Sequence, residues 1–206
     1  MSPPVTVVDL GLGNLGSVLQ ALARAGGEPR LSADPAEIGR GARVVLPGVA
    51  AFGLGMERAR RLGLRGALDE ALRRGAPVLG ICLGMQILFE EGEEDGVRKG
   101  LGLLPGRVTR LPPGVQVPHI GWQRLQTTAA SPLLADAVAP WAYFANSYRC
   151  EAAEGVTQAV ADHSGVQIAA VVGRANVHGV QFHPEKSARD GEAMLARFLR
   201  LPEGAP

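Results

Sequence analysis

The sequence predicts an α/β fold, formed by one domain over residues 1–206, with a central, mostly parallel sheet flanked by helices. In the first half of the chain, short apolar runs of strand length alternate with stretches of helical periodicity, which is typical of a parallel sheet with covering helices. After Gly106 the pattern changes to short strands separated by Gly, Pro and Ser turns. Such a succession predicts antiparallel pairs, so the second half should add an antiparallel extension to the sheet.

The order of the elements follows from the same patterns. A first buried strand is expected at Val5–Asp9, and a helix follows it and ends near Ala25. The small residues of Pro47–Gly55 indicate a loop, and the acidic run Glu90–Asp95 indicates a second, solvent-exposed loop. Further strands are expected at Arg43–Leu46, Ala76–Ile81, Arg107–Leu111, Trp122–Leu125, Ala142–Tyr148, Val156–Ala161, Gln167–Val172 and Val177–Phe182, and further helices at Leu64–Arg74, Met85–Glu91 and Ala188–Arg200.

Composition argues against several classes of function. A formal net charge of +1 gives no electrostatic attraction to nucleic acid or an anionic membrane, and no apolar run approaches the roughly 20 residues that span a bilayer. The N-terminus lacks the basic and apolar regions of a signal peptide. Cys82 and Cys150 are too few for a disulfide framework, and no Cys/His spacing typical of zinc is present. We therefore expect a cytoplasmic protein without a metal or other cofactor.

A sharp corner between a strand and a helix is predicted around Cys82. This residue lies between Gly80 and Gly84, directly after an apolar run and before helix-forming residues. The pattern is the G-x-nucleophile-x-G elbow, with Cys in place of Ser. Such an elbow lifts the side chain out of the sheet to a helix N-terminus, where partial positive charge favours the thiolate. Cys82 is therefore a candidate nucleophile, and the alternative is a small buried cysteine in an ordinary strand–helix unit.

A base for this nucleophile is expected in the segment that carries His183. This residue follows the last predicted strand, and open α/β folds gather their sites at the carboxyl ends of strands. In extended backbone, residues i and i+2 point the same way, so Glu185 would lie beside the imidazole. Its carboxylate would then fix the tautomer of His183, while the other ring nitrogen faces Cys82. Alternatively, His183 merely ends a strand and Glu185 caps the next helix.

A glycine-rich segment after the first strand admits a different interpretation. Gly11–Gly16 matches the pattern G-x-G-x-x-G, and Asp34 follows about 20 residues later, as in a dinucleotide-binding oxidoreductase. The chain contains 28 glycines, however, so a chance match to this short pattern is expected. The alternative is a tight turn that brings a helix close to the sheet.

The motifs together resemble those of the class I, or triad, glutamine amidotransferases. The resemblance rests on Gly80–Gln86 and His183–Glu185, extends from residue 5 to near residue 200, and implies the single-domain, flavodoxin-like fold of that family. Other stretches resemble one branch of the family, the glutaminase subunits that supply ammonia for histidine biosynthesis. These stretches are Gly13–Ser17, Pro47–Val49, Lys99–Leu103, Pro118–Trp122, Tyr143–Phe144 and Gln181–Ser187.

The resemblance implies a role for each residue of the site. Cys82 would attack the side-chain amide of glutamine, His183 would protonate the leaving ammonia, and Glu185 would support His183. A glutamyl thioester would form on the cysteine and then be hydrolysed. The backbone of Val49 and Leu83 would form the oxyanion hole. Glutamine would be bound by Gly48, Gln86, Ser147 and Tyr148.

The same resemblance implies a partner protein. Ammonia would pass to a (β/α)₈-barrel cyclase subunit in a heterodimer and react there with the ribulosyl aminoimidazole nucleotide PRFAR. The loop Gly11–Ser17 would then face this partner instead of a nucleotide. The residues expected at the interface are Asn14, Trp122, Tyr143 and Lys186.

Departures from the family pattern bear on activity. Ala50 stands where the family has the last glycine of Pro-Gly-Val-Gly, Asn146 replaces the histidine of His-Ser-Tyr, and Gln123 replaces an asparagine. Ala does not tolerate positive φ as Gly does, so Ala50 would stiffen a strand whose peptide flip switches the oxyanion hole on. We therefore expect the isolated chain to have low glutaminase activity.

Two further alternatives stay open. The triad is shared by amidotransferases that supply anthranilate, aminodeoxychorismate or pyridoxal phosphate synthesis, and it does not separate these pathways. The other alternative is a non-catalytic subunit that keeps the fold for assembly or ligand sensing. The intact triad and Gln86 argue against that second possibility.

Overall fold

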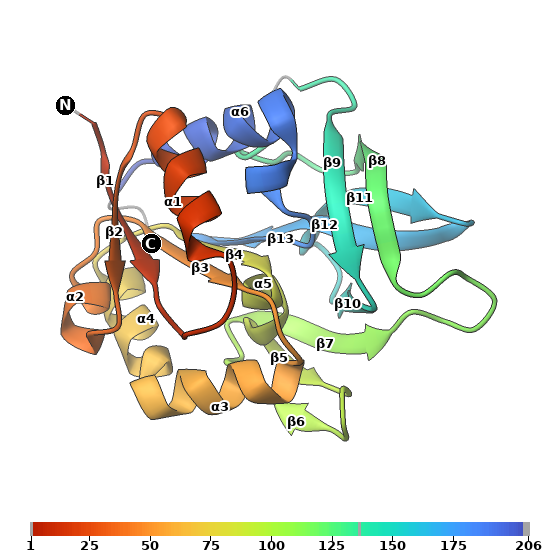
Figure 1. Cartoon of the computed structure of the whole chain (residues 1–206), viewed down its shortest axis with the longest axis horizontal. Coiled ribbons are helices and arrows are strands. Elements are labelled where there is room, and N and C mark those ends of the chain that lie inside the picture. The colour runs from red at the N-terminus through yellow and green to blue at the C-terminus, as the bar shows by residue number, and fades with distance from the viewer. Residues whose placement is uncertain (1, 136, 204–206) are drawn as a thin grey trace.

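The computed structural model describes residues 2–135 and 137–203, and within them a nine-stranded sheet runs in the order β2-β1-β3-β4-β13-β12-β11-β8-β9 (Figure 1). The first part of this order is parallel and comprises β2 (Glu28–Ser32), β1 (Pro4–Val8), β3 (Val44–Gly48), β4 (Val78–Cys82) and β13 (Val177–Val180). The rest is antiparallel and comprises β12 (Val166–Arg174), β11 (Thr157–His163), β8 (His119–Thr127) and β9 (Trp141–Asn146). The predicted parallel sheet with an antiparallel extension is confirmed.

Helices cover both faces of the parallel part (Figure 1). One face carries α1 (Leu15–Arg24) and α6 (Ala188–Leu199), and the other carries α2 (Pro35–Gly39), α3 (Phe52–Leu62) and α4 (Leu64–Arg73). Successive strand residues point to opposite faces, so Val45 packs with α1 and α6 while Val44 and Leu46 pack with α3 and α4. Of the helices described, none is long and apolar enough to cross a membrane.

A second, four-stranded sheet was not predicted. It runs in the order β10 (Tyr148–Ala152), β7 (Leu104–Arg110), β5 (Phe89–Gly92), β6 (Arg98–Lys99). The helix after the elbow, α5 (Leu83–Ile87), is consequently shorter than expected, and β5 occupies part of the predicted acidic loop. The helix ends early because the carbonyls of Ile87 and Leu88 accept hydrogen bonds from the N–H groups of Leu101 and Leu103, at 2.8 Å each. Those carbonyls are therefore not available to a further helical turn.

The predicted loop Pro47–Gly55 also needs correction, because α3 begins inside it at Phe52. A Cβ atom on Gly55 would lie 3.1 Å from a methyl of Leu83 and 3.3 Å from a methyl of Ile87. This glycine therefore marks the close approach of α3 to α5. The backbone N–H of Phe52 donates to the Glu94 carboxylate at 2.6 Å, so a residue from the acidic run completes the N-terminus of α3.

Candidate active site

The strand-to-helix corner at Cys82 is present. Cys82 ends β4 and α5 begins at the next residue, with φ 53° and ψ −110° at the cysteine itself. A non-glycine residue in this region is strained, and such strain is common at functional sites. The flanking glycines allow close packing: a Cβ on Gly84 would lie 1.7 Å from the carbonyl oxygen of Leu46, and one on Gly80 would lie 2.6 Å from the backbone nitrogen of Met85. The corner is therefore fixed against β3 and α5.

His183 and Glu185 form the predicted pair, although by a different geometry. His183 Nδ1 donates to Glu185 Oε1 at 2.8 Å, and both side chains are almost fully buried. Glu185 lies in a 3₁₀ turn, η1 (Pro184–Lys186), so the expected extended backbone is wrong for this segment. The turn is held by Ser187, whose hydroxyl donates to the carbonyl of His183 at 2.6 Å, and by the N–H of His183, which donates to Tyr143 at 2.9 Å.

The environment of His183 favours its charged form. Burial of the imidazole lowers its pKa, but hydrogen bonds with Cys82 and Glu185, and the charges of both groups, outweigh burial and raise the pKa to about 9. His183 is therefore protonated at neutral pH, with a carboxylate at one ring nitrogen and the sulfur of Cys82 as its other partner. This arrangement supports nucleophilic attack by the sulfur followed by proton donation from the imidazolium.

A cavity of about 200 Å³ opens in front of Cys82. Gly48 lies opposite Cys82 on the neighbouring strand, and its backbone packs closely against Leu83, since a Cβ atom on Gly48 would lie 3.2 Å from the leucine methyl. Five residues predicted for the oxyanion hole or for glutamine binding line the cavity, namely Val49, Leu83, Gln86, Ser147 and Tyr148.

Three other residues in or beside this cavity were given no role in the site from the sequence. Glu94 lines it, although the acidic run was interpreted as a solvent-exposed loop. Its only sequence signal was its charge, and the contact that fixes it comes from the distant residue Phe52. Asn146 also lines the cavity and donates to the carbonyl of Tyr148 at 3.1 Å. Gln181 was quoted only as part of a motif, yet its amide nitrogen lies 3.8 Å from the sulfur of Cys82.

The other three histidines, His119, His163 and His178, are buried and do not line the cavity at Cys82. His119 is buried, and its ring stacks on His163 at 4.1 Å and on Phe144 at 4.7 Å between ring centroids. Burial, and then the neighbouring His163, lower the pKa of His119 to about 4. Burial likewise lowers the pKa of His178 to about 4. Within residues 2–135 and 137–203, no group of three or more His, Cys, Asp or Glu side chains is arranged to hold a metal ion.

The glycine-rich segment after β1 is a tight turn. Asp9 accepts a hydrogen bond from the N–H of Gly11 at 2.7 Å, and Asn14 caps α1 by accepting from Ser17 at 3.3 Å. The space beside this turn is about 90 Å³, which is too small for a ligand the size of a dinucleotide. Asp34, the acidic residue that follows the glycine pattern, instead caps α2 by accepting from the N–H of Ala36 at 2.8 Å. The dinucleotide interpretation is therefore wrong.

The residues predicted to face a partner lie close together. Trp122 and Tyr143 pair across β8 and β9 with ring centroids 5.8 Å apart, and the ammonium of Lys186 lies 5.9 Å from the Tyr143 ring. Asn14 and Lys186 both line the 90 Å³ space, which also contacts His183 and Glu185. The four residues are therefore linked through Lys186, beside His183 and Glu185.

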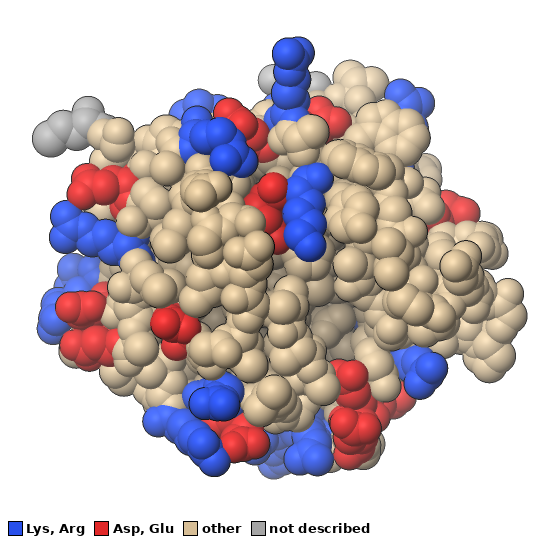
Figure 2. Space-filling view, in the orientation of Figure 1, with Lys and Arg blue, Asp and Glu red and all other residues tan. Residues whose placement is uncertain are grey.

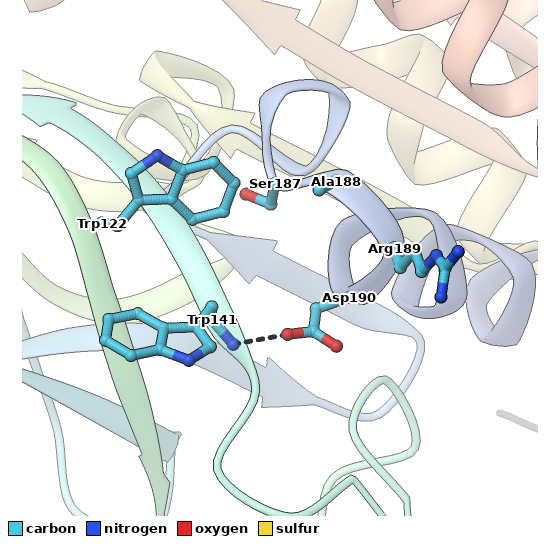
Figure 3. Close-up of a pocket in the computed structure, with 6 residues that line it drawn as sticks. All are labelled: Trp122, Trp141, Ser187, Ala188, Arg189 and Asp190. Carbon is cyan, nitrogen blue, oxygen red and sulfur yellow. Dashed lines mark hydrogen bonds between the residues drawn. The ribbon is translucent and has the colours of Figure 1, made fainter.

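A groove of about 700 Å³ continues this surface between β9 and the start of α6 (Figure 3). The indoles of Trp122 and Trp141 lie on one side of it, and residues 187–190 form the other. Asp190 closes the end by accepting a hydrogen bond from the backbone N–H of Trp141 at 2.7 Å. Much of the surface over β8 and β9 carries no charged side chain (Figure 2). Ile120 and the two indoles, which are 62%, 46% and 45% exposed, supply the apolar face of β8 and β9.

Comparison of the sequence and the fold with known proteins identifies the protein family to which the chain belongs. The family model described as glutamine amidotransferase class-I matches residues 7–201. The chain therefore belongs to the class I glutamine amidotransferase family. Solved structures agree on the fold: a glutamine amidotransferase superposes with a TM-score of 0.73 at 22% identity, covering 93% of this chain and 98% of that one. PurLQS from Thermotoga maritima superposes with a TM-score of 0.71 at 21% identity, covering 97% and 98%.

Relatives with higher sequence identity than these solved structures indicate one branch of the amidotransferase family. Imidazole glycerol phosphate synthase subunit HisH of Symbiobacterium thermophilum is 48% identical over 96% of this chain and 93% of its own length. The subunit of the same name from Streptococcus sanguinis is 44% identical, and the match covers 93% of each chain. The one from Geobacillus sp. is 42% identical, and the match covers 97% of this chain and 98% of the relative. Within the amidotransferase family, the chain is therefore grouped with the HisH subunits.

Proposed function

We propose that this chain is the glutaminase subunit of an imidazole glycerol phosphate synthase, and that it acts in the cytoplasm in histidine biosynthesis. It hydrolyses glutamine to glutamate and delivers the ammonia to a cyclase subunit. The observation that carries the proposal is the position of Cys82 at the wall of a cavity, with buried His183 and Glu185 behind it. The similarity to HisH subunits over nearly the whole chain supports the choice of pathway.

In the proposed reaction, the sulfur of Cys82 attacks the side-chain carbonyl carbon of glutamine. The bond from that carbon to nitrogen breaks, His183 gives its proton to the leaving ammonia, and a thioester remains. His183, now neutral, takes a proton from water as the water attacks the thioester, and glutamate leaves. Glu185 stabilises the imidazolium at both ends of this cycle. Backbone N–H groups at Val49 and Leu83 would hold the oxyanion.

The other cavity residues have chemistry suited to the rest of glutamine. The carboxylate of Glu94 offers an ion pair to the α-ammonium group, an inference supported by its place on the cavity wall. Gln86 and the backbone at Ser147 and Tyr148 supply neutral hydrogen-bonding groups beside it. The carboxylate of Glu94, by holding the α-ammonium group, and the sulfur of Cys82, by facing the same cavity, would together orient the substrate with its side-chain amide at the sulfur.

The proposed partner is a cyclase subunit built as a (β/α)₈ barrel, which converts PRFAR with ammonia into imidazole glycerol phosphate and AICAR. The apolar face of β8 and β9 supports a docking surface there, because contiguous exposed apolar patches mark interaction sites. Asn14 and Lys186 would lie at its edge, beside the triad, so docking on this face would enclose the route by which ammonia leaves.

The proposal is tested by measuring glutamate release from glutamine, with and without a cyclase partner that carries a substrate analogue. We expect a low rate for the isolated chain and strong activation in the complex. Replacement of Cys82 by Ala in the complex should abolish the activity. Hydrolysis that is unaffected by the cyclase would move the chain to another pathway, and a high rate for the isolated chain would contradict the expected effect of Ala50.

Docking on the apolar face makes a separate prediction for Trp122. Large aromatic side chains at the centre of an interface typically contribute about 2 kcal/mol or more when truncated, so Trp122→Ala should weaken binding of the cyclase at least about tenfold. Val97, which is 71% exposed on the loop before β6, provides the matched control. Isothermal calorimetry of the two variants is the measurement. Equal affinities for Trp122→Ala and Val97→Ala would place the interface elsewhere.

A further inference from the structure

A fully buried glutamine lies directly against the candidate nucleophile. Gln181 follows β13, whose Val180 pairs with Ile81, so the next residue along lies beside Cys82. The side chain has no exposure to solvent, and its Nε2 lies 3.8 Å from the sulfur of Cys82. A buried amide is costly unless its donors and acceptors are satisfied, so the contacts of Gln181 determine how it is oriented.

Those contacts form a series of hydrogen bonds in which each donor and each acceptor is determined. Gln86 Nε2 donates to the backbone carbonyl of Tyr148 at 3.3 Å and to Gln181 Oε1 at 3.1 Å. A carbonyl oxygen only accepts, so the Tyr148 carbonyl requires Gln86 to present its NH₂ group on that side. Gln181 must then present its oxygen to Gln86. Its own NH₂ group consequently faces the sulfur of Cys82, and rotating either amide would bring two donors or two acceptors together.

We propose that Gln181 positions the sulfur of Cys82, favours its thiolate form, and connects it through Gln86 to the wall of the glutamine cavity. An N–H donor stabilises an anionic acceptor more than a neutral one, so the amide favours the reactive form of the cysteine. The sulfur is then held by two donors, Gln181 and the imidazolium of His183. This inference rests on the proposed function, because it assigns Cys82 the role of nucleophile.

The connection to Gln86 gives Gln181 a second task. Gln86 lines the cavity in which glutamine is proposed to bind, while Gln181 lies behind it. The NH₂ group of Gln86 already donates to two acceptors, the Tyr148 carbonyl and Gln181 Oε1. A substrate held at this wall keeps Gln86 in place, and Gln86 in turn keeps the amide of Gln181 turned toward the sulfur. Loss of Gln181 should therefore affect the reactivity of the sulfur more than the binding of glutamine.

Alkylation of Cys82 by iodoacetamide, followed across the pH range, measures thiolate formation without requiring glutaminase activity. Gln181→Met keeps the length of the side chain and removes the donor. We expect the pH midpoint of alkylation to move up and the rate below that midpoint to fall, by about tenfold for each unit of the displacement. Mass spectrometry identifies the modified residue and separates Cys82 from Cys150.

Other ionisable groups near the sulfur stay in place in this experiment. His183 and Glu185 lie behind it, and Glu94 lines the same cavity. Cys150 lies on β10, where burial, and then the charge of Cys82, raise its pKa. None of them is changed in Gln181→Met, so a displaced midpoint reports the loss of the amide donor. Gln126→Met, on the exposed side of β8, is the matched control and should alkylate like the unmodified chain.

Gln181→Glu provides a second variant if the methionine variant is not folded by circular dichroism. The carboxylate still accepts from Gln86 but does not donate to the sulfur when ionised, so it too should move the midpoint upward. An alkylation profile identical to that of the unmodified chain, in either folded variant, would overturn the inference. A displaced profile together with no glutamine hydrolysis under any condition would support the role of Gln181 and reject the proposed function instead.

Discussion

Gly84→Ala is expected to abolish the stable native fold. A Cβ atom at this position would lie 1.7 Å from the carbonyl oxygen and 2.7 Å from the carbonyl carbon of Leu46. Both are backbone atoms of β3, a central strand paired with β1 and β4, so they do not move aside without breaking the sheet. Overpacking of a core by a side chain typically costs about 1–3 kcal/mol, and a backbone clash of this size exceeds that range. Native stability is only about 5–15 kcal/mol, so the variant should lose most of it.

Urea unfolding followed by circular dichroism measures the effect, and Gly66 provides the control. Gly66 lies inside α4, and a Cβ atom added there would have no other atom within 4 Å. Gly66→Ala should therefore stabilise the chain by about 0.5–1 kcal/mol, because glycine is unfavourable in a helix interior. If Gly84→Ala unfolded at the same urea concentration as the unmodified chain, the elbow and β3 would not be as closely packed as described.

The close packing of Gly84 against β3 explains why the elbow at Cys82 was predictable from the sequence. Gly80, Cys82 and Gly84 are spaced by a local requirement, since a strand that turns directly into a helix needs small residues on both sides of the corner. The parallel strands were predictable for a similar reason, because each is a short apolar run that is covered on both faces. The pair His183 and Glu185 is also local, although its 3₁₀ turn was not predicted from the sequence.

Other parts of the site depend on contacts between distant segments. Residues 47–55 contain several small residues, which favour a loop, but packing of Gly55 on Leu83 outweighs that preference and allows α3 to begin at Phe52. Glu94 belongs to a run of acidic residues that resembles a solvated loop, and its bond to the distant Phe52 helps to hold it at the cavity. The direction of the amide chain at Gln181 depends on the Tyr148 carbonyl, which no sequence pattern reports.

Glu185→Gln is expected to reduce glutamine turnover in the cyclase complex by about 10²–10⁴, the range in which loss of general acid–base function or of a triad carboxylate falls. The amide is nearly the same size as the carboxylate but carries no charge. In the unmodified chain, burial lowers the pKa of His183, whereas Cys82 and Glu185 together raise it to about 9. Without the carboxylate charge, the effect of burial is less opposed and the pKa of His183 falls.

The sign of the pH dependence follows directly. The proposed mechanism needs His183 protonated when ammonia leaves, so activity is lost as pH rises through the pKa of this residue. That loss should occur near pH 9 in the unmodified complex and at lower pH in Glu185→Gln. The measurement is kcat/KM for glutamine across the pH range. Glu192→Gln, which removes a half-exposed carboxylate that pairs with Arg24 at 3.6 Å, is the matched control and should leave the profile unchanged. An alkaline limb at the same pH in Glu185→Gln would mean that Glu185 does not set the protonation of His183, and Cys82 alone would then have to account for it.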